Sequence, residues 1–104
     1  MPEHTYYVYI MASRSLTLYI GVTSTIEVRV RQHKTGTFEG FSKQYYCTRL
    51  VYYERYKEPL AAIAREKQLK RWSREKKLTL IKQSNPTFLD LSEEWGKPLP
   101  PISL

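Results

Sequence analysis

Two strand-like runs stand almost end to end near the start of the chain. They are TYYVYIMAS (5–13) and SLTLYIGVT (15–23), and both are rich in β-branched and aromatic residues. The few residues between them, around Ser13, Arg14 and Ser15, suit a tight connection, so the pair predicts a β-hairpin. The chain has 104 residues, the length of one domain. Its fold is therefore expected to be built on an antiparallel sheet.

A helix is predicted directly after the hairpin, near residues 26–36. Ile26, Arg29, Val30 and His33 fall at positions i, i+3, i+4 and i+7, and residues with this spacing share one face of a helix. An arginine and a histidine on the same face as two core-type residues are not required by packing. They raise the question of which chemistry would use them.

The rest of the chain predicts a loop, a third strand and further helices. Proline commonly occupies the first turn of a helix, which supports a helix beginning at Pro59. The order β-β-α-β-α-α predicts the α+β class, with a small three-stranded antiparallel β-sheet flanked by helices. The expected ranges are 36–48 for the loop, 49–56 for the strand, 59–72, 74–83 and 87–95 for the helices, 1–95 for the whole domain and 96–104 for a proline-rich C-terminal tail.

Apolar runs and cysteine content limit where the chain is expected to work. No run approaches the ~18 apolar residues that a membrane span needs, and the first residues lack the pattern of a signal peptide. The single cysteine, Cys47, cannot form an internal disulfide. We therefore expect a cytoplasmic protein that does not act in a membrane. Its oligomeric state is not encoded in any visible pattern.

The charge is strongly basic and unevenly placed. The chain carries 17 Lys and Arg against 10 Asp and Glu, a formal net charge of +7. Residues 57–82 alone hold nine Lys and Arg against three Glu, a local charge of +6. A one-sided basic block favours polyanionic partners such as nucleic acid, although a solvated helix surface would give the same pattern. The nine tyrosines include aromatic groups that can stack on bases.

Glu66 stands at the rim of an apolar stripe. On a helical wheel it lies between Ala62 and Leu69 on one side and Ile63 on the other. Burying a carboxylate is costly unless it is paired or binds a metal. An ion pair with Lys70 at i+4, worth about 0.3–0.5 kcal/mol, is the simpler interpretation of the residue by itself.

Other polar residues have equally plain interpretations when each is taken alone. His33 suits a packing role, whereas Arg29 on a core-facing side needs an anionic partner. Tyr7, Tyr9 and Tyr19 can converge on one face of the hairpin, as tyrosines that simply pack would also do.

The order of these residues, however, resembles the motif series of the GIY-YIG endonuclease superfamily over residues 5–90. Its YIG motif is present, with an arginine ten residues after the tyrosine and a histidine four residues later. LVYYE and the later NP pair are similar to the short stand-alone bacterial branch of YhbQ/YazA-like proteins. The first motif departs from the pattern, because Tyr7-Val8-Tyr9 replaces Gly-Ile-Tyr and Tyr7 can crowd the mouth of the site. The matching positions are Tyr9, Tyr19-Ile20-Gly21, Arg29, His33, Glu66 and Asn85.

This resemblance implies a metal-dependent endonuclease that hydrolyses DNA with low sequence specificity and acts in DNA repair or processing. One tyrosine would order or deprotonate the attacking water once its pKa is lowered, and Arg29 would bind the scissile phosphate. Glu66 would hold a single Mg²⁺ or Mn²⁺. The implied catalytic set is Tyr9, Tyr19, Arg29, His33 and Glu66. Substrate contacts are expected from Gly21, Lys67, Lys70, Arg71, Arg74 and Asn85.

Two alternatives stay open from the sequence. The chain can be a nucleic-acid-binding module that keeps the GIY-YIG fold with little or no catalytic activity, for which Tyr7 is the argument. It can also be a protein-interaction domain that uses the basic helix and the proline-rich tail. Neither the preferred DNA structure, branched or single-stranded, nor the identity of the general base is decided by sequence.

Overall fold

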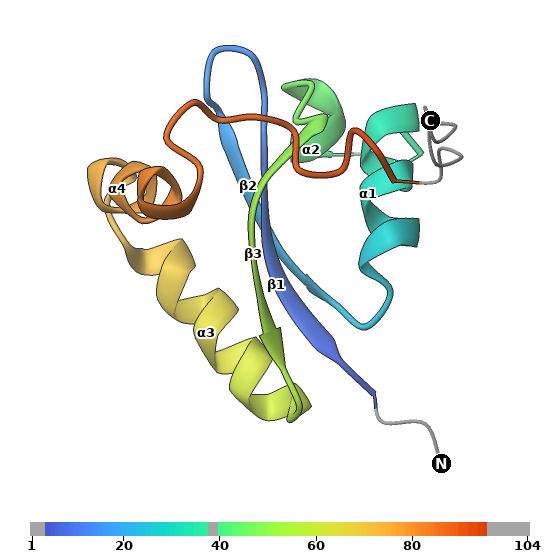
Figure 1. Cartoon of the computed structure of the whole chain (residues 1–104), viewed down its shortest axis with the longest axis vertical. Helices are drawn as coiled ribbons and strands as arrows, with labels where there is room; N and C mark the ends of the chain where they lie inside the picture. The colour runs from blue at the N-terminus through green and yellow to red at the C-terminus, as the bar shows by residue number, and fades with distance from the viewer. Residues whose placement is uncertain (1–3, 38–39, 96–104) are drawn as a thin grey trace, which may run out of the picture.

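Three antiparallel strands form the centre of the fold (Figure 1). The structure, a computed structural model, describes residues 4–37 and 40–95, so the tail predicted over 96–104 lies outside the described residues. The sheet order is β2-β1-β3, and β1 pairs antiparallel with both neighbours. The predicted α+β architecture with a three-stranded sheet is thereby confirmed. The strands are β1 (Tyr6–Ala12), β2 (Leu18–Thr23) and β3 (Arg49–Tyr56).

Helices cover both faces of this sheet. In Figure 1, α3 and α4 lie on one side of the strands and α1 lies on the other. The three long helices begin and end within one residue of the predicted ranges. The helices of the described residues are α1 (Ile26–Thr35), α2 (Phe41–Gln44), α3 (Pro59–Arg71) and α4 (Arg74–Ser84).

Alternation along β1 divides the core into two layers. Val8 and Ile10 are fully buried beneath α3 and α4, whereas Tyr9 and Met11 pack with α1. Successive side chains of a strand point to opposite faces, which explains why one strand supplies both layers. The alternation of side chains along β1 thus places Tyr9 on the face of the sheet that α1 covers.

Local sequence signals account for the helix ends. Pro59 occupies the first turn of α3. The Ser73 side chain caps α4 by accepting a hydrogen bond from the backbone N–H of Lys76, at 3.2 Å. Gly36 ends α1 in the left-handed region, at φ 70°, where a residue without a Cβ is favoured.

The hairpin connection is longer than predicted, because β2 begins at Leu18 and not at residue 15. Ser13 holds the turn through two bonds to Thr17: its N–H donates to the Thr17 carbonyl at 3.0 Å, and its Oγ accepts from the Thr17 N–H at 2.9 Å. Leu16 lies at φ 64°, a left-handed conformation that ends strand geometry.

Two other expectations were wrong. The predicted loop 36–48 contains the short helix α2, and the helix predicted over 87–95 is a series of turns. Phe88 at φ 54° and the side chain of Asp90 explain the second difference. Asp90 accepts hydrogen bonds from the backbone N–H groups of Leu50 and Ser92 and pairs with Lys34 of α1, so the segment crosses from α4 to α1 instead of coiling.

Candidate active site

The side chain of Tyr9 extends from β1 over the backbone of β2 at Gly21. The strand register pairs it with Gly21. A Cβ added at Gly21 would lie 2.5 Å from both Cζ and Oη of the Tyr9 ring, a distance that no real side chain tolerates. The sequence predicted that Gly21 would permit a close approach by substrate. The structure corrects this expectation, because the group that lies against Gly21 is the phenol of Tyr9.

The rings of Tyr9, Tyr19 and His33 lie close together beside Gly21. The Tyr9 hydroxyl lies 2.8 Å from Nε2 of His33, and both residues are only 3% exposed. The Tyr19 ring lies 4.9 Å from the His33 ring and 6.3 Å from the Tyr9 ring, between centroids. Residues from β1, β2 and α1 therefore form one cluster, as their predicted common role requires.

Protonation in this cluster follows from burial and a nearby guanidinium. Burial, reinforced by the positive charge of Arg29, lowers the pKa of His33 to about 4. The imidazole is therefore neutral at pH 7, and its Nε2 shares a hydrogen bond with the Tyr9 hydroxyl. Burial also raises the pKa of Tyr9, with a smaller contribution from Tyr19 that outweighs the opposite effect of Arg29. Arg29 does lower the pKa of Tyr9, as the sequence predicted for a neighbouring cation, but in the ligand-free protein burial outweighs this effect.

Arg29 and Glu66 act on Tyr9 from helices on opposite faces of the sheet. Arg29, exposed on α1 one turn before His33, lowers the pKa of Tyr9, and Glu66 of α3 raises it. The Glu66 side chain is 15% exposed, and its Oε1 lies 3.6 Å from Nζ of Lys70. The carboxylate thus makes the predicted i,i+4 ion pair and also lies within electrostatic reach of the tyrosine cluster.

The arrangement suits a divalent ion held by one carboxylate. Within residues 4–37 and 40–95, no three His, Cys, Asp or Glu side chains gather into a metal cluster. The half-buried carboxylate of Glu66 offers hard oxygen donors, and Mg²⁺ commonly uses one or two carboxylates while keeping several waters. The donor set near Glu66 therefore fits Mg²⁺ or Mn²⁺.

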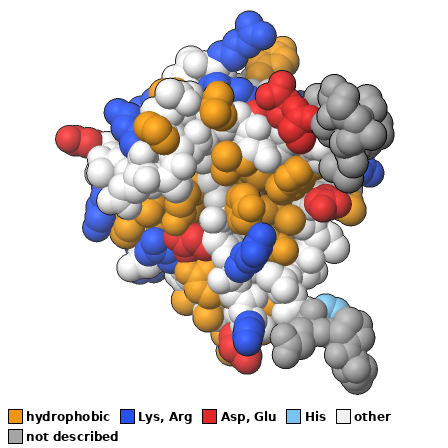
Figure 2. All heavy atoms as spheres, viewed as in Figure 1, with side chains coloured by type: hydrophobic (Ala, Val, Ile, Leu, Met, Phe, Trp, Pro, Cys, Tyr) orange, Lys and Arg blue, Asp and Glu red, His pale blue; other side chains and the backbone are white. Residues whose placement is uncertain are grey.

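The predicted substrate contacts fall into two groups. Lys67, Lys70 and Arg71 are exposed on α3, and Arg74 donates from Nη1 to the carbonyl of Leu16 at 2.6 Å. Figure 2 shows Lys and Arg side chains spread over the viewed face and not gathered into one patch.

Asn85 has a different place from the one expected. It is 3% exposed, its Nδ2 donates to the carbonyls of Val51 and Leu89, and its Oδ1 accepts from the Leu89 N–H. These bonds join the end of α4 to β3. Because the amide is buried and engaged with backbone, we leave Asn85 out of the proposed site.

Comparison with known proteins decides the family. The model of the GIY-YIG catalytic domain matches residues 5–79. The chain belongs to the GIY-YIG family. It is 35% identical to a UPF0213 protein of Haloquadratum walsbyi over 78 residues, covering 75% of this chain and 88% of that protein. It is 34% identical to a UPF0213 protein of Staphylococcus haemolyticus over 83 residues, covering 80% and 99%.

A solved structure supports the same fold. The solution NMR structure of a UPF0213 protein from Bacillus halodurans aligns with a TM-score of 0.55 at 22% identity, covering 90% of this chain and 99% of that one. The short GIY-YIG relatives confirm the stand-alone branch that the sequence indicated. Family membership places the chain among endonucleases, whose substrate in general is nucleic acid.

The departure in the first GIY-YIG motif does not fill the site. Tyr7 replaces its glycine, and the Tyr7 ring packs edge-on against Tyr53 of β3, with 6.1 Å between centroids. Tyr9, two residues later, turns to β2 instead. The two rings therefore diverge, and Tyr7 joins the α1 face of the core.

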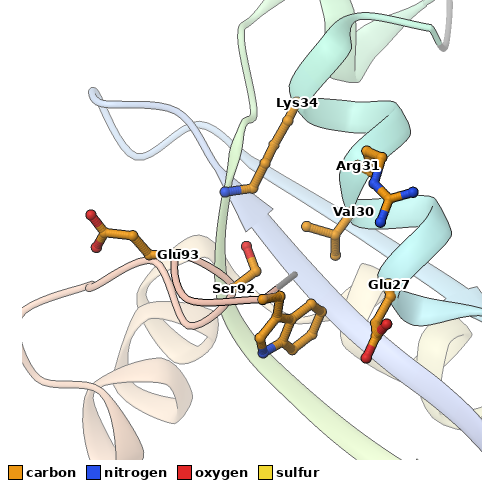
Figure 3. A pocket seen from close by; sticks show the side chains of 7 residues that line it. Glu27, Val30, Arg31, Lys34, Ser92 and Glu93 are labelled. Atoms are coloured by element: carbon orange, nitrogen blue, oxygen red, sulfur yellow. The ribbon is translucent and has the colours of Figure 1, made fainter. Parts of the chain in front are cut away.

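Another hollow lies beside the GIY-YIG motifs. Figure 3 shows side chains that line a pocket between α1 and the turns near residue 95. Its volume is about 220 Å³. Its walls carry two acidic and two basic groups around an indole, so its charge favours neither an anion nor a cation. The lining residues are Glu27, Val30, Arg31, Lys34, Ser92, Glu93 and Trp95. None of the five predicted catalytic residues lines this pocket.

Among the helices of the described residues, none has the length and apolar character that a membrane span requires.

Proposed function

We propose that this protein is a cytoplasmic, metal-dependent endonuclease that hydrolyses DNA phosphodiester bonds with low sequence specificity during DNA repair or processing. The observation that carries the proposal is the hydrogen bond between Tyr9 and a neutral His33, with Arg29 and Glu66 both close enough to act on Tyr9. In the proposed tautomer, Nε2 of His33 carries no proton and accepts from Tyr9. A proton acceptor, a permanent cation and a carboxylate are the groups that phosphodiester hydrolysis needs.

Proton transfer can run through Tyr9 to His33. As a water oxygen attacks phosphorus, its proton passes to Oη of Tyr9, and the Tyr9 proton passes to Nε2 of His33. The bond between phosphorus and the 3′ oxygen breaks, and that oxygen takes a proton from solvent. A phosphate beside Arg29 offsets part of the charge that lowers the pKa of His33, so the imidazole becomes a stronger base when substrate is bound. General base catalysis of this kind contributes about 10²–10⁴-fold in rate.

Arg29 and Tyr19 supply binding and orientation. The Arg29 guanidinium is a planar fork that matches two oxygens of a phosphate. The Tyr19 ring, packed on His33, is partly exposed and can hold the attacking water beside Tyr9. Glu66 would hold a Mg²⁺ or Mn²⁺ ion, which as a Lewis acid stabilises negative charge on the leaving oxygen.

Replacing Glu66 by Gln tests the proposal. The wild-type protein should cleave duplex, single-stranded, flapped or branched DNA in the presence of Mg²⁺ or Mn²⁺. Glu66→Gln should reduce the rate by about 10²-fold or more, the scale of a lost charge-stabilising group, while DNA binding is retained. Glu75→Gln, the same change at an exposed position of α4, serves as the matched control. Equal cleavage by wild type and Glu66→Gln would exclude Glu66 from the chemistry.

The binding-module alternative has one observation in its favour. Tyr9 and His33 are almost fully buried in the ligand-free protein, so water must gain access to Tyr9 before it can react. A module without activity would bind the same DNA panel and leave every strand intact with either metal. A protein-interaction domain would in addition lack the steep negative salt dependence that phosphate contacts produce.

A further inference from the structure

A carboxylate with many hydrogen-bond donors lies on β3, beside the strand that carries Tyr9. Glu54 of β3 accepts hydrogen bonds from the hydroxyl of Tyr56 at 2.6 Å and from the hydroxyl of Tyr52. It also accepts two from Arg65 of α3, one from Nε and one from Nη2, each at 3.0 Å. Burial works against the charged form, but these donors together lower the pKa of Glu54, so the carboxylate is ionised at pH 7.

Arg65 is held as firmly as its partner. Its Nη1 donates to Oε1 of Gln68 at 2.7 Å, and its guanidinium lies 5.0 Å from the centre of the Trp72 ring. Two parallel N–H donors to one carboxylate fix direction as well as distance, because the guanidinium is a rigid plane. The Glu54–Arg65 pair is therefore a directional tie between β3 and α3.

The Glu54–Arg65 pair lies on one side of the seam, which is the line of apolar contact between α3 and the sheet. Ala62 and Leu69 form that seam and are fully buried. At 100° per residue, Arg65 falls on one side of the seam and Glu66 on the other. Because Arg65 is tied to β3, its neighbour Glu66 is turned in the opposite direction, toward the side from which it acts on Tyr9.

We propose that Glu54 is a positioning residue of the nuclease site. By holding Arg65, it fixes the rotation of α3 about its own axis and so aims the carboxylate of Glu66 at the tyrosine cluster. The inference rests on the proposed function, in which Glu66 holds the metal ion. Functional groups must be held within about 0.5 Å and 10–20° of their working geometry. The apolar packing of Ala62 and Leu69 is not directional, whereas the hydrogen bonds between Glu54 and Arg65 are.

The test uses the full chain and two readouts. Free Mn²⁺ is titrated by electron paramagnetic resonance to give its affinity without DNA, and cleavage of a fixed substrate gives kcat and KM separately. Glu54→Gln should lower Mn²⁺ affinity and kcat by about 10- to 100-fold each, the usual effect of removing a group that orients a metal ligand. KM for DNA should change by less than about twofold, because the phosphate-binding residues are untouched.

Two further variants separate positioning from loss of folding. Glu58→Gln makes the same chemical change four residues later at an exposed site, where the side chain makes no capping bond, and it should match wild type in both readouts. The double variant Glu54→Gln/Arg65→Gln should lose no more Mn²⁺ affinity and kcat than the more impaired of the two single variants. Each single change already breaks the Glu54–Arg65 pair, so the second change has no further effect on it. Should Glu54→Gln fail to fold, Arg65→Lys carries the same test, because it keeps both charges and loses the fork.

The outcomes distinguish the inference from the function on which it rests. Wild-type Mn²⁺ affinity and kcat in a folded Glu54→Gln variant, with Glu66→Gln still inactive, would overturn the positioning role alone. The positioning role would also be overturned if Glu54→Gln lowered only the amount of folded protein, while each folded molecule kept the wild-type affinity for Mn²⁺. A wild-type protein that binds no Mn²⁺ and cuts no DNA would remove both the proposed function and this inference.

Discussion

The phenol of Tyr9 occupies the space that any side chain at position 21 would need. The conformation of the glycine is not the reason, since Gly21 is not among the residues with positive φ. What matters is the missing Cβ. The glycine of the Tyr19-Ile20-Gly21 motif therefore serves the first motif, because it lets Tyr9 of β1 reach His33 of α1.

Gly21→Ala should both destabilise the protein and abolish cleavage. The added methyl would meet Cζ and Oη of Tyr9 at 2.5 Å, and the buried ring has little room to withdraw. Overpacking of this kind costs about 1–3 kcal/mol, which urea unfolding would measure. In a Tyr9→Leu background the same glycine change should cost much less stability. An equal cost in both backgrounds would show that the ring of Tyr9 is not the obstacle.

His33 should make stability depend on pH below neutrality. The pKa of an unfolded histidine is about 6.5, whereas burial and Arg29 hold that of His33 to about 4. Between these values the unfolded chain binds more protons, so the free energy of unfolding should fall as pH decreases from about 6.5 to about 4, by an amount on the order of 3 kcal/mol.

A His33→Gln variant isolates that contribution. Glutamine can still accept the Tyr9 hydrogen bond, and it does not titrate. Urea unfolding at several pH values should give a shallower slope for His33→Gln than for wild type across this window. Identical slopes would mean that groups other than His33 cause the whole effect in this pH range.

The two tyrosines of the cluster should not be equivalent. Tyr9→Phe removes the hydroxyl that is bonded to His33, so single-turnover cleavage should slow by about 10²–10⁴-fold. Tyr19→Phe should slow it less, because the Tyr19 ring still packs on His33. Tyr46→Phe, at a site that is 77% exposed, is the control for a lost hydroxyl. A larger defect in Tyr19→Phe would assign the water's proton to Tyr19.

The basic block of α3 and α4 should determine how steeply DNA binding depends on salt. Replacing Lys70, Arg71 and Arg74 together by Gln should reduce the slope of log affinity against log salt by about one per lost phosphate contact. A triple change of Arg14, Arg31 and Arg55 to Gln removes the same charge from exposed positions outside the block and is the matched control. Equal slopes in both triple variants would reduce the block to a solubilising surface.

Much of the fold could be predicted because each long element carries its own local signal. Pro59, Ser73 and Gly36 mark helix ends through backbone chemistry that depends on few neighbours. The turns near Leu16 and Phe88 could not be predicted, since both residues adopt positive φ that their side chains do not favour. Those conformations are imposed by tertiary contacts, such as the Asp90 bonds to β3 and α1.

The sequence could name candidate residues for the site, but it could not give the directions of their side chains. Sequence order named Tyr9, Tyr19, Arg29, His33 and Glu66, but a ring direction depends on what it packs against. The role of Gly21 and the raised pKa of Tyr9 both follow from such packing.

Glu54 was missed for a related reason. The sequence named Glu54 only as the last residue of LVYYE and gave it no role, because its partner Arg65 lies eleven residues later on another element. Asn85 shows the reverse, because a residue that matched a motif proved to be buried between backbone groups.

The central position of β1 has a consequence for how the protein loses activity. Tyr9 lies on the only strand that is hydrogen-bonded along both edges in the described sheet, and its partners come from a second strand and from helices on both faces. The five proposed catalytic residues lie on strands and helices, so we expect that a local opening of a loop will not disable them while the rest of the fold stays intact. In a denaturant titration, inactivation and global unfolding should coincide, and dilution out of denaturant should restore both in a single kinetic phase.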